Sequence, residues 1–505
     1  MTAAIKVAVI GAGPAGIYAS DILSKTDLNV SIDLFERLPA PYGLVRYGVA
    51  PDHPRIKQII VALYKILQRG DIRLLGNVEI GRQIMLEELR EYYDAIIVAT
   101  GADRDRGLPI PGIDLPESYG AADFVSWYDG NPDYPRHWPL NAREIAIFGV
   151  GNVALDVARM LTKHVPDLLV TEIPANVAEG LAASPVTDVH VFGRRGPAQV
   201  KFTPLELREL GKVPDVDVVV SEEDFDFDEG SERALRASNQ QRQVVKTLTH
   251  YASVDPAEQT ASRRIHIHLF ESPAEVLADA DGHVCAVLTE RTELMGDGTV
   301  QGTGRFTEWP VQAVYRAVGY YSSPLSELPF DENLGVIPNV EGRVLAEVGG
   351  AKTLPGVYAT GWVKRGPVGL IGSTKSDAQQ TIEHLVEDAQ AGLLTRANAN
   401  ANATNQDGDA ILRLLEERGV AYTTWHGWEI LDNYEQALGK AFGETDDGRS
   451  RERVKVVSRE TMTRISRGEA LPVAEVSEAE LVGEPGEMGF PPAVERFADY
   501  TGPRP

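Results

Sequence analysis

Two glycine-rich turns hold the residues of this chain best suited to binding a charged ligand. The first contains Gly11, Gly13 and Gly16, and the second contains Gly149 and Gly151. Each turn follows an apolar run and precedes a segment compatible with a helix. In such a strand–turn–helix unit, glycines let the backbone approach a pyrophosphate, and free N–H groups at the helix start attract its charge. The spacing therefore predicts two dinucleotide-binding turns.

The strands that follow the two turns end in residues of opposite charge. Glu36 follows the apolar run 32–35 at the end of the expected strand. A carboxylate at this position accepts hydrogen bonds from ribose hydroxyls and repels a ribose phosphate. Arg194 and Arg195 follow the run 189–193, and their guanidinium groups match a 2′-phosphate. Each charge-assisted bond contributes about 1.5–3 kcal/mol, a preference of about a hundredfold or more for NADP over NAD. The first turn therefore suits FAD or NAD, and the second suits NADP.

The bulk composition narrows the classes of function. A net charge of −25 argues against a general nucleic-acid binder and against a protein of anionic membranes, because both surfaces would repel it. With Cys285 as the only cysteine, the chain cannot form a disulfide, a redox Cys-x-x-Cys, an iron–sulfur cluster or a cysteine-rich zinc site. No metal site is expected, and electrons must leave a bound flavin for an external acceptor.

No run approaches the roughly 18 apolar residues that span a bilayer, and the amino terminus enters a strand at Ile5. We therefore expect neither membrane insertion nor a targeting peptide, and predict a cytoplasmic enzyme. The oligomeric state is left open.

The order of the motifs predicts an α/β fold with two Rossmann-like dinucleotide-binding domains and a C-terminal extension. The runs ending at Gly101 and Gly361 both finish in Ala-Thr-Gly, which indicates that the chain leaves the first domain and later returns to it. The predicted domains are an FAD domain at 1–107 and 331–395, an NADP domain at 108–330, a linker at 396–410 and a C-terminal helical region and tail at 411–505.

Longer motifs now support a family resemblance. The chain resembles the adrenodoxin-reductase type of ferredoxin–NADP reductase in the turn at 11–16, the segment 41–54, the segment 149–159, the run 193–197 and the run 361–372. The likeness extends from the amino terminus to about residue 390. It implies a glutathione-reductase-like two-domain architecture, FAD and NADP(H) as cofactors, and single-electron transfer to a ferredoxin-type iron–sulfur protein.

The resemblance also implies which residues contact each nucleotide. The FAD contacts are expected at Gly11, Gly13, Ala15, Gly16, Glu36, Leu44, Val78, Trp362, Gly369, Leu370 and Ile371. The NADP contacts are expected at Val150, Gly151, Asn152, Val153, Arg194, Arg195, Glu206 and Gly369. Related disulfide-reducing flavoproteins usually carry an aspartate where Trp362 stands, which favours the adrenodoxin-reductase branch.

Two further residues are candidates for assisting the chemistry. His53 lies between Asp52 and Pro54, where chemistry alone favours a turn residue and the resemblance favours a functional one. Glu206 and Glu209 are three residues apart, so on a helix both project from one face. We expect Glu209 to pair with His53 beside the flavin and so to stabilise reduced flavin or orient the nicotinamide. Hydride transfer itself needs no protein nucleophile.

Docking of an acidic partner is expected to involve basic side chains. Lys364 and Arg365 are either solvated charges or docking residues next to the flavin. A local basic stretch in the inserted domain is the second candidate surface. It comprises Arg208, Lys212, Arg233, Arg236, Arg242 and Lys246.

Three other functions fit parts of this pattern. A flavin-dependent NADPH monooxygenase would use the same two nucleotides, and an electron-bridging subunit like that of glutamate synthase would need cluster cysteines that this chain lacks. A non-enzymatic sensor of NADPH and FAD would keep Arg194 and Arg195 without reducing the flavin. Bleaching of the flavin by NADPH separates the reductase from the sensor, and substrate hydroxylation marks the monooxygenase.

Overall fold

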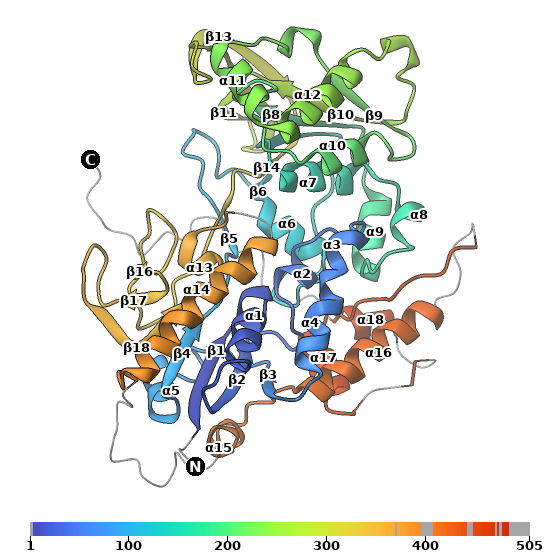
Figure 1. The fold of residues 1–505 in the computed structure, drawn as a ribbon. Helices are drawn as coiled ribbons and strands as arrows, with labels where there is room; N and C mark the ends of the chain where they lie inside the picture. Colours follow the sequence, from blue (N-terminus) through green and yellow to red (C-terminus); the bar gives the residue numbers. More distant parts are fainter. Residues whose placement is uncertain are drawn as a thin grey trace. The chain divides into compact units, whose positions relative to one another are not determined.

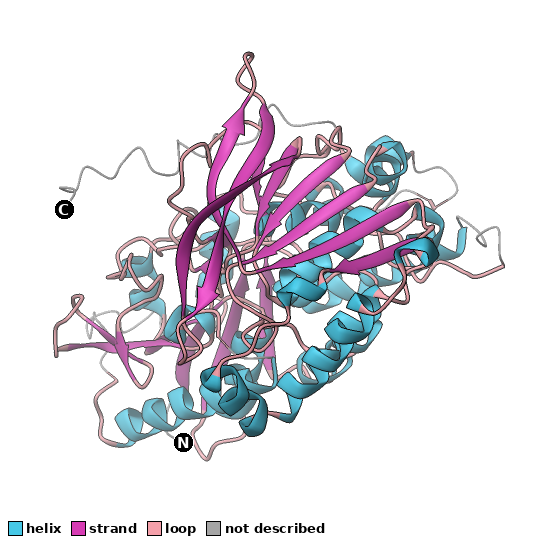
Figure 2. Cartoon of the chain, turned by 90° about the horizontal axis from the view of Figure 1, so that it is seen from above, coloured by secondary structure: helices cyan, strands magenta, loops and turns pink. Residues whose placement is uncertain are grey.

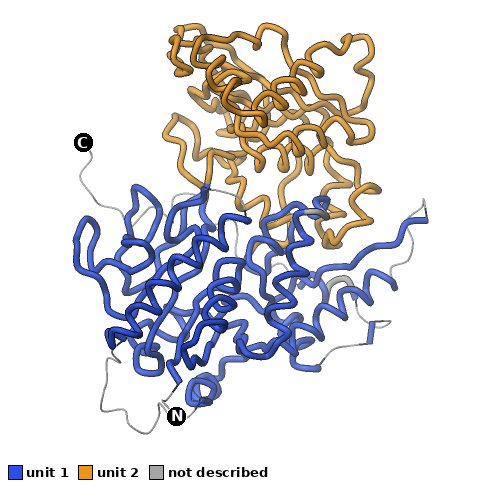
Figure 3. Tube along the Cα trace, in the orientation of Figure 1, with its two compact units in different colours: residues 1–104, 129–133, 320–483 blue, residues 105–128, 134–319, 484–505 orange. Residues whose placement is uncertain are grey.

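The computed structural model describes residues 4–368, 371–394, 408–441, 448–469, 472–473 and 477–483. The chain forms two compact units, coloured separately in Figure 3. The first takes residues 1–104, 129–133 and 320–483, and the second takes 105–128 and 134–319. The short strands β5 (Arg104–Asp105) and β15 (Tyr320–Tyr321) lie where the chain passes between units. The return comes earlier than the expected 330/331, because the chain turns at Gly319 directly after its last buried strand.

The first unit is built on a seven-stranded sheet with strand order β16-β17-β18-β4-β1-β2-β3 (Figure 1). Strands β18, β4, β1, β2 and β3 are parallel, and β16 and β17 continue the sheet in antiparallel pairing. The bounds are β1 (Ile5–Ile10), β2 (Val30–Glu36), β3 (Ile72–Gly76), β4 (Ala95–Val98), β16 (Asn339–Val340), β17 (Arg343–Leu345) and β18 (Thr353–Ala359).

Core residues cover both faces of this sheet. Val7 and Val9 of β1 belong to one buried cluster, whereas Ala8 and Ile10 belong to another. Successive residues of a strand point to opposite faces, so an uninterrupted apolar run is what a sheet buried on both sides requires. The helices of this unit are α1 (Pro14–Leu23), α2 (Leu44–Tyr47), α3 (Pro54–Lys57), α4 (Ile59–Leu67), α5 (Leu86–Tyr92), α13 (Trp362–Arg365), α14 (Ile371–Gln390), α15 (Ala410–Glu417), α16 (Trp425–Ala441), α17 (Arg459–Ser466) and α18 (Glu478–Val482).

The helices after residue 408 belong to the first unit rather than to a region of their own. Trp428 and Leu431 of α16 are buried in the same cluster as Val7 and Val9. Lys455 is fully buried, and its Nζ donates to the carbonyl oxygens of Arg46 (2.7 Å) and Asp129 (3.0 Å). Buried polar contacts of this kind join the C-terminal segment to the first unit. Residues 396–407 of the expected linker, and the tail from 484, lie outside the described residues.

The second unit contains a parallel six-stranded sheet of order β6-β14-β7-β8-β10-β9 and an antiparallel sheet of order β11-β12-β13, whose strands are magenta in Figure 2. The bounds are β6 (Ser118–Gly120), β7 (Glu144–Phe148), β8 (Asp188–Gly193), β9 (Val216–Val220), β10 (Arg263–Leu269), β11 (Glu271–Ala278), β12 (Val284–Leu294), β13 (Val300–Pro310) and β14 (Ala313–Arg316). Its helices are α6 (Ala121–Tyr128), α7 (Asn152–Thr162), α8 (Val165–Leu168), α9 (Ala175–Ala183), α10 (Pro204–Leu210), α11 (Glu229–Ala237) and α12 (Asn239–Ala252). Among the described residues, no helix combines the length and apolar character needed to cross a membrane.

Candidate nucleotide-binding sites

The first glycine-rich turn connects β1 to α1 in the first unit. Gly11 has φ +107°, and a Cβ there would lie 2.5 Å from the carbonyl oxygen of Ala99. A Cβ at Gly16 would lie 1.9 Å from the carbonyl oxygen of Gly11. Gly13 precedes the first residue of α1, Pro14, whose fixed φ suits a helix start. The turn is therefore closed by packing that only glycine allows, with the start of a helix exposed to a ligand.

Glu36 ties the end of β2 to this turn. Its Oε2 accepts a hydrogen bond from Ala12 N at 2.9 Å, and its Oε1 accepts one from Leu38 N at 3.0 Å. The side chain is buried, and this burial raises the pKa of the carboxyl group, while the two backbone donors act in the opposite direction. A carboxylate can accept about four hydrogen bonds, so the two that it makes leave capacity for ribose hydroxyls.

Two other expected FAD residues, Leu44 and Val78, lie around the same turn. The backbone N–H of Tyr42, at φ +86°, donates to Ala12 O at 2.8 Å, which brings Leu44 at the start of α2 close to the turn. Val78 is buried, and its N–H donates to Glu36 O at 2.8 Å. The fold of one unit therefore brings residues from separate segments to a single place.

Trp362 lies close to the first glycine-rich turn, although it is more than 340 residues later in the sequence. It is the first residue of α13 and follows Gly361, which has φ +76°. A Cβ at Gly361 would lie 2.6 Å from Cβ of Ala15, so the two turns are in direct contact. Tyr320 stacks near Trp362, with ring centroids 6.5 Å apart and planes 28° apart.

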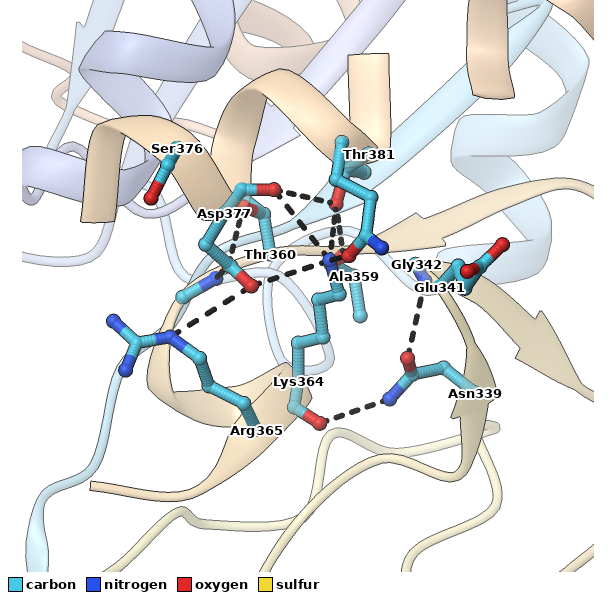
Figure 4. A network of polar contacts seen from close by, with 12 residues as sticks. Asn339, Glu341, Gly342, Ala359, Thr360, Lys364, Arg365, Ser376, Asp377 and Thr381 are labelled. Carbon is cyan, nitrogen blue, oxygen red and sulfur yellow. Dashed lines mark hydrogen bonds and ion pairs between the residues drawn. The ribbon is translucent and has the colours of Figure 1, made fainter. Parts of the chain in front are cut away.

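Asp377 of α14 holds the Gly361–Trp362 turn. Figure 4 shows its carboxylate beside Thr360, Lys364 and Arg365. Its Oδ2 accepts hydrogen bonds from Gly361 N at 2.6 Å and from Thr360 Oγ1 at 3.1 Å. Its Oδ1 lies 3.2 Å from Nζ of Lys364. Asp377 was not predicted from the sequence, because it lies 16 residues beyond Gly361 and no local pattern joins the two residues.

The prediction that Lys364 docks a partner is wrong. Its side chain is buried, and besides Asp377 its Nζ contacts Gln380 Oε1 at 2.8 Å and Thr381 Oγ1 at 3.1 Å (Figure 4). Arg365 lies 3.7 Å from Asp377 and donates to the carbonyl oxygen of Val368. Lys364 therefore serves the internal structure of the turn, because burying a charge requires a partner of opposite charge. Arg365 is half-buried, and its role in docking stays a prediction.

The last three expected FAD residues are described only in part. Gly369 and Leu370 lie outside the described residues, and Ile371 begins α14. The expected contact of Gly369 with both nucleotides therefore stays a prediction.

The second glycine-rich turn connects β7 to α7 in the second unit. Gly149 has φ +138°, and a Cβ there would lie 2.2 Å from Ala317 O. A Cβ at Gly151, the residue before α7, would meet no atom within 4 Å. Space is therefore open in front of the start of α7, where backbone N–H groups favour an anion.

The first residues of α7 are linked to the loop before α10. Asn152 Oδ1 accepts a hydrogen bond from Thr203 N at 2.8 Å, and Val150 O accepts one from Lys201 N at 2.9 Å. Val153 follows Asn152 in the first turn of α7. Lys201 is exposed, and its Nζ makes no ion pair with any described residue.

Arg194 and Arg195 follow β8 directly, and hydrogen bonds hold the backbone carbonyl groups of both residues. Arg194 O accepts from Thr292 Oγ1 at 2.8 Å, and Arg195 O accepts from Phe270 N at 3.3 Å. Arg194 is exposed, and the buried Nε of Arg195 has no hydrogen-bond partner among the described residues. An unpaired buried donor is costly, so this atom indicates a missing acceptor such as a phosphate oxygen.

His53 and the two glutamates occupy different units. His53 is 4% exposed in the turn before α3, where its N–H donates to Ala50 O at 3.0 Å. Glu206 is buried and Glu209 is half-buried, both on α10 in the second unit. The pairing of Glu209 with His53 stays a prediction.

Part of the basic stretch in the second unit is neutralised locally. Arg233 pairs with Glu229 at 2.8 Å and Arg236 with Glu232 at 3.1 Å, each one helical turn apart. All four side chains are exposed. The surface is therefore less positive than the sequence of cations alone indicates.

Known proteins resemble this chain over most of its length. Residues 5–184 match the family of pyridine nucleotide-disulphide oxidoreductases. NADPH-ferredoxin reductase FprA of Mycobacterium tuberculosis is 38% identical over 474 residues, which cover 92% of this chain and 99% of that protein. The mitochondrial NADPH:adrenodoxin oxidoreductase of Arabidopsis thaliana is 36% identical over 447 residues, covering 86% of this chain and 91% of that protein.

The solved structures agree with these relatives. The structure of Mycobacterium tuberculosis FprA in complex with NADPH matches with a TM-score of 0.82 and 37% identity, covering 92% of this chain and 100% of that one. The two-domain α/β architecture with parallel sheets is thus confirmed. The chain belongs to the family of adrenodoxin-reductase-type NADPH–ferredoxin reductases.

Proposed function

We propose that this chain is an FAD-dependent NADPH–ferredoxin reductase. It takes a hydride from NADPH and delivers single electrons to a ferredoxin-type iron–sulfur protein, as the names of its relatives support. One contrast carries the proposal: Glu36 stands beside the first glycine-rich turn, and Arg194 and Arg195 stand at the corresponding strand end of the second unit. This contrast matches an unphosphorylated ribose in one unit and a 2′-phosphorylated ribose in the other.

The first unit would hold FAD. The turn around Gly11 and Gly16 would face the pyrophosphate, and Glu36 would accept hydrogen bonds from the adenosine ribose. The segment at Trp362, held by Asp377, would lie against the isoalloxazine ring. When bound, the flavin accepts the hydride as an electron pair and releases electrons one at a time. This chain contributes binding, orientation and electrostatics.

The second unit would hold NADPH. The open space in front of Gly151 would admit the pyrophosphate, with Asn152 fixing the adjoining loop. Arg194 and Arg195 would bind the 2′-phosphate through charge-assisted hydrogen bonds. We add Lys201 to this group, since its backbone is fixed to Val150 and its ammonium group has no ion-pair partner among the described residues. Glu206 would make a polar contact with the nucleotide.

His53 and Glu209 are proposed as positioning residues that hold charge near the reacting nicotinamide. A protonated imidazole stabilised by a carboxylate would favour the reduced, more negative flavin. Their effect is electrostatic, so loss of either one slows the reaction and does not abolish it.

We also propose an electron acceptor and a cellular location for this chain. The acceptor is an acidic ferredoxin-type protein, steered by exposed cations such as Arg208 and Lys212. A cytoplasmic location is proposed, in keeping with a chain that carries a single cysteine. No contact with nucleic acid is expected at a net charge of −25.

Anaerobic mixing of the purified yellow protein with NADPH tests the function. We expect prompt bleaching of the flavin, a much weaker response to NADH, and reduction of cytochrome c that depends on added ferredoxin. A colourless protein, or equal use of NADH and NADPH, would contradict the proposal. Tight binding of NADPH without bleaching would instead identify a sensor, and NADPH-dependent hydroxylation of a substrate would identify a monooxygenase.

A further inference from the structure

Three histidines of the second unit lie on one face of the parallel sheet. His190 of β8 stands directly opposite His266 of the neighbouring strand β10. His268 is two residues beyond His266 and therefore lies on the same face. The nucleotide-binding proposal uses none of the three.

The ring nitrogens of these histidines are close together. Nδ1 of His190 lies 3.0 Å from Nε2 of His268. One nitrogen from each of the three rings can be chosen so that all lie within 4.8 Å of one another. Donors bound tetrahedrally to one zinc ion are about 3.3 Å apart, given a Zn–N length of about 2.0–2.1 Å. The three rings stack within 5–14° of parallel, so binding one ion would require the rings to rotate until their nitrogen lone pairs converge.

Two carboxylates border the histidine cluster. Asp188 Oδ1 lies 2.8 Å from Nε2 of His266, and a carboxylate on one ring nitrogen orients a histidine for binding metal through the other. Glu144 Oε2 lies 3.6 Å from Nε2 of His190, a buried nitrogen without a hydrogen-bond partner among the described residues. The cation Arg264 lies 3.6 Å from Asp188, its register partner, and precedes His266 by two residues on the same face of β10.

The cluster is accessible at one end and covered at the other. The side chains of His190 and His266 are 11% and 20% exposed, and Glu144 is 42% exposed. The ring of Trp309 from β13 packs on His268, with centroids 4.3 Å apart. An ion can therefore enter beside Glu144, and Trp309 would report its arrival.

We propose that His190, His266 and His268 form a binding site for one divalent transition-metal ion of the Zn²⁺, Ni²⁺ or Cu²⁺ class, with the carboxylate of Glu144 at its exposed edge. Imidazole nitrogens are the donors that these ions share, and three histidines with a carboxylate is a donor set suited to them. Bound metal would link β8 to β10 and stabilise the second unit. The site is independent of the proposed reductase function.

The test titrates the chelator-treated FAD holoenzyme with NiCl₂ and with ZnCl₂ by calorimetry. We expect one ion per chain and at least a tenfold loss of affinity in His266→Asn and His268→Gln. His250→Asn changes an exposed histidine of α12 and should leave the affinity unchanged. CuCl₂ should also quench tryptophan fluorescence less in Trp309→Phe than in the wild type.

Thermal unfolding distinguishes a variant that has lost the metal site from one that fails to fold. Because a ligand that binds the folded state raises its stability, Zn²⁺ should raise the Tm of the wild type and of His250→Asn but not of His266→Asn. Equal metal uptake by wild type and His266→Asn, or no uptake by the wild type, would overturn the proposal. Either result would leave the histidines as a purely structural stack.

Discussion

Arg46 and Glu435 form a two-pronged ion pair in which the guanidinium nitrogens lie 2.6 and 3.0 Å from the two carboxylate oxygens. The side chains are only 3% and 0% exposed. Arg46 lies in α2, two residues after the expected FAD contact Leu44, and Glu435 lies in α16. This ion pair, between residues 389 apart in the sequence, thus holds α2 against α16.

Replacing Glu435 by Ala should destabilise the first unit by about 3–5 kcal/mol, because it removes the carboxylate that pairs with the buried Arg46 guanidinium. We expect a lower midpoint in urea and loss of FAD on gel filtration. Asn433→Ala, on the exposed side of the same helix, serves as the control. Full retention of stability in Glu435→Ala would show that water or another group replaces the carboxylate.

Replacing Asp377 by Ala should loosen the turn at Trp362. Lys364 would lose its carboxylate while buried, and Gly361 N would lose its acceptor, at a cost of about 3–5 kcal/mol. The expected result is faster release of FAD, measured as the recovery of free-flavin fluorescence. Glu383→Gln, exposed on the same helix, should release FAD at the wild-type rate. An unchanged release rate in Asp377→Ala would separate this turn from flavin binding.

Replacing Arg194 or Arg195 by Ala should raise the KM for NADPH by roughly 10- to 150-fold, the equivalent of about 1.5–3 kcal/mol, and leave the KM for NADH nearly unchanged. Steady-state reduction of ferricyanide with both nucleotides measures the difference. The control is Arg233→Ala, whose exposed side chain pairs with Glu229. Equal losses with NADH and NADPH would place the 2′-phosphate elsewhere.

Replacing His53 by Gln should slow flavin reduction by roughly tenfold, or about 1.4 kcal/mol in the activation barrier. Stopped-flow absorbance gives the rate for His53→Gln, Glu209→Gln and the double variant. If the two residues act as a pair, the double variant will be no slower than the slower single variant. Complete loss of turnover with FAD still bound, or strictly additive effects, would contradict the pairing.

Asp105 predicts a pH dependence of stability. Its carboxylate oxygens accept hydrogen bonds from Ala122 N at 3.0 Å, and burial, together with the nearby charge of Asp123, raises its pKa to about 8. The folded state therefore holds a proton that the unfolded chain releases above pH 4 or so. The resulting stabilisation is complete below the unfolded pKa and is lost as the pH rises through about 8. The Tm should fall between pH 6 and pH 9, and Asp105→Asn should reduce that fall.

The two nucleotide turns were predictable because the local backbone conformation of each turn requires glycine. The positive φ of Gly11 and Gly149, the end of β2 at Glu36 and the arginines that follow β8 are all properties of short segments of sequence. The supporting contacts were not predictable in this way. A buried Lys364 looks the same in sequence as a solvated one, and only the fold brings Asp377 to it.

The histidine cluster shows the same limit in another form. The alternation of His266 and His268 predicts a shared face of one strand. Their approach to His190 depends on the strand order β8-β10-β9, in which the later strand inserts between two earlier ones. The sequence of neither strand alone indicates this strand order.

The participation of α16 and Lys455 in the first unit bears on how the chain matures during synthesis. The NADP-binding unit ends at residue 319 and can fold while translation continues, whereas the flavin unit needs segments from both ends of the polypeptide. Its amino-terminal strands must wait on the ribosome until α16 has emerged. Uptake of FAD is therefore a late event, and nascent chains arrested before about residue 440 should be colourless.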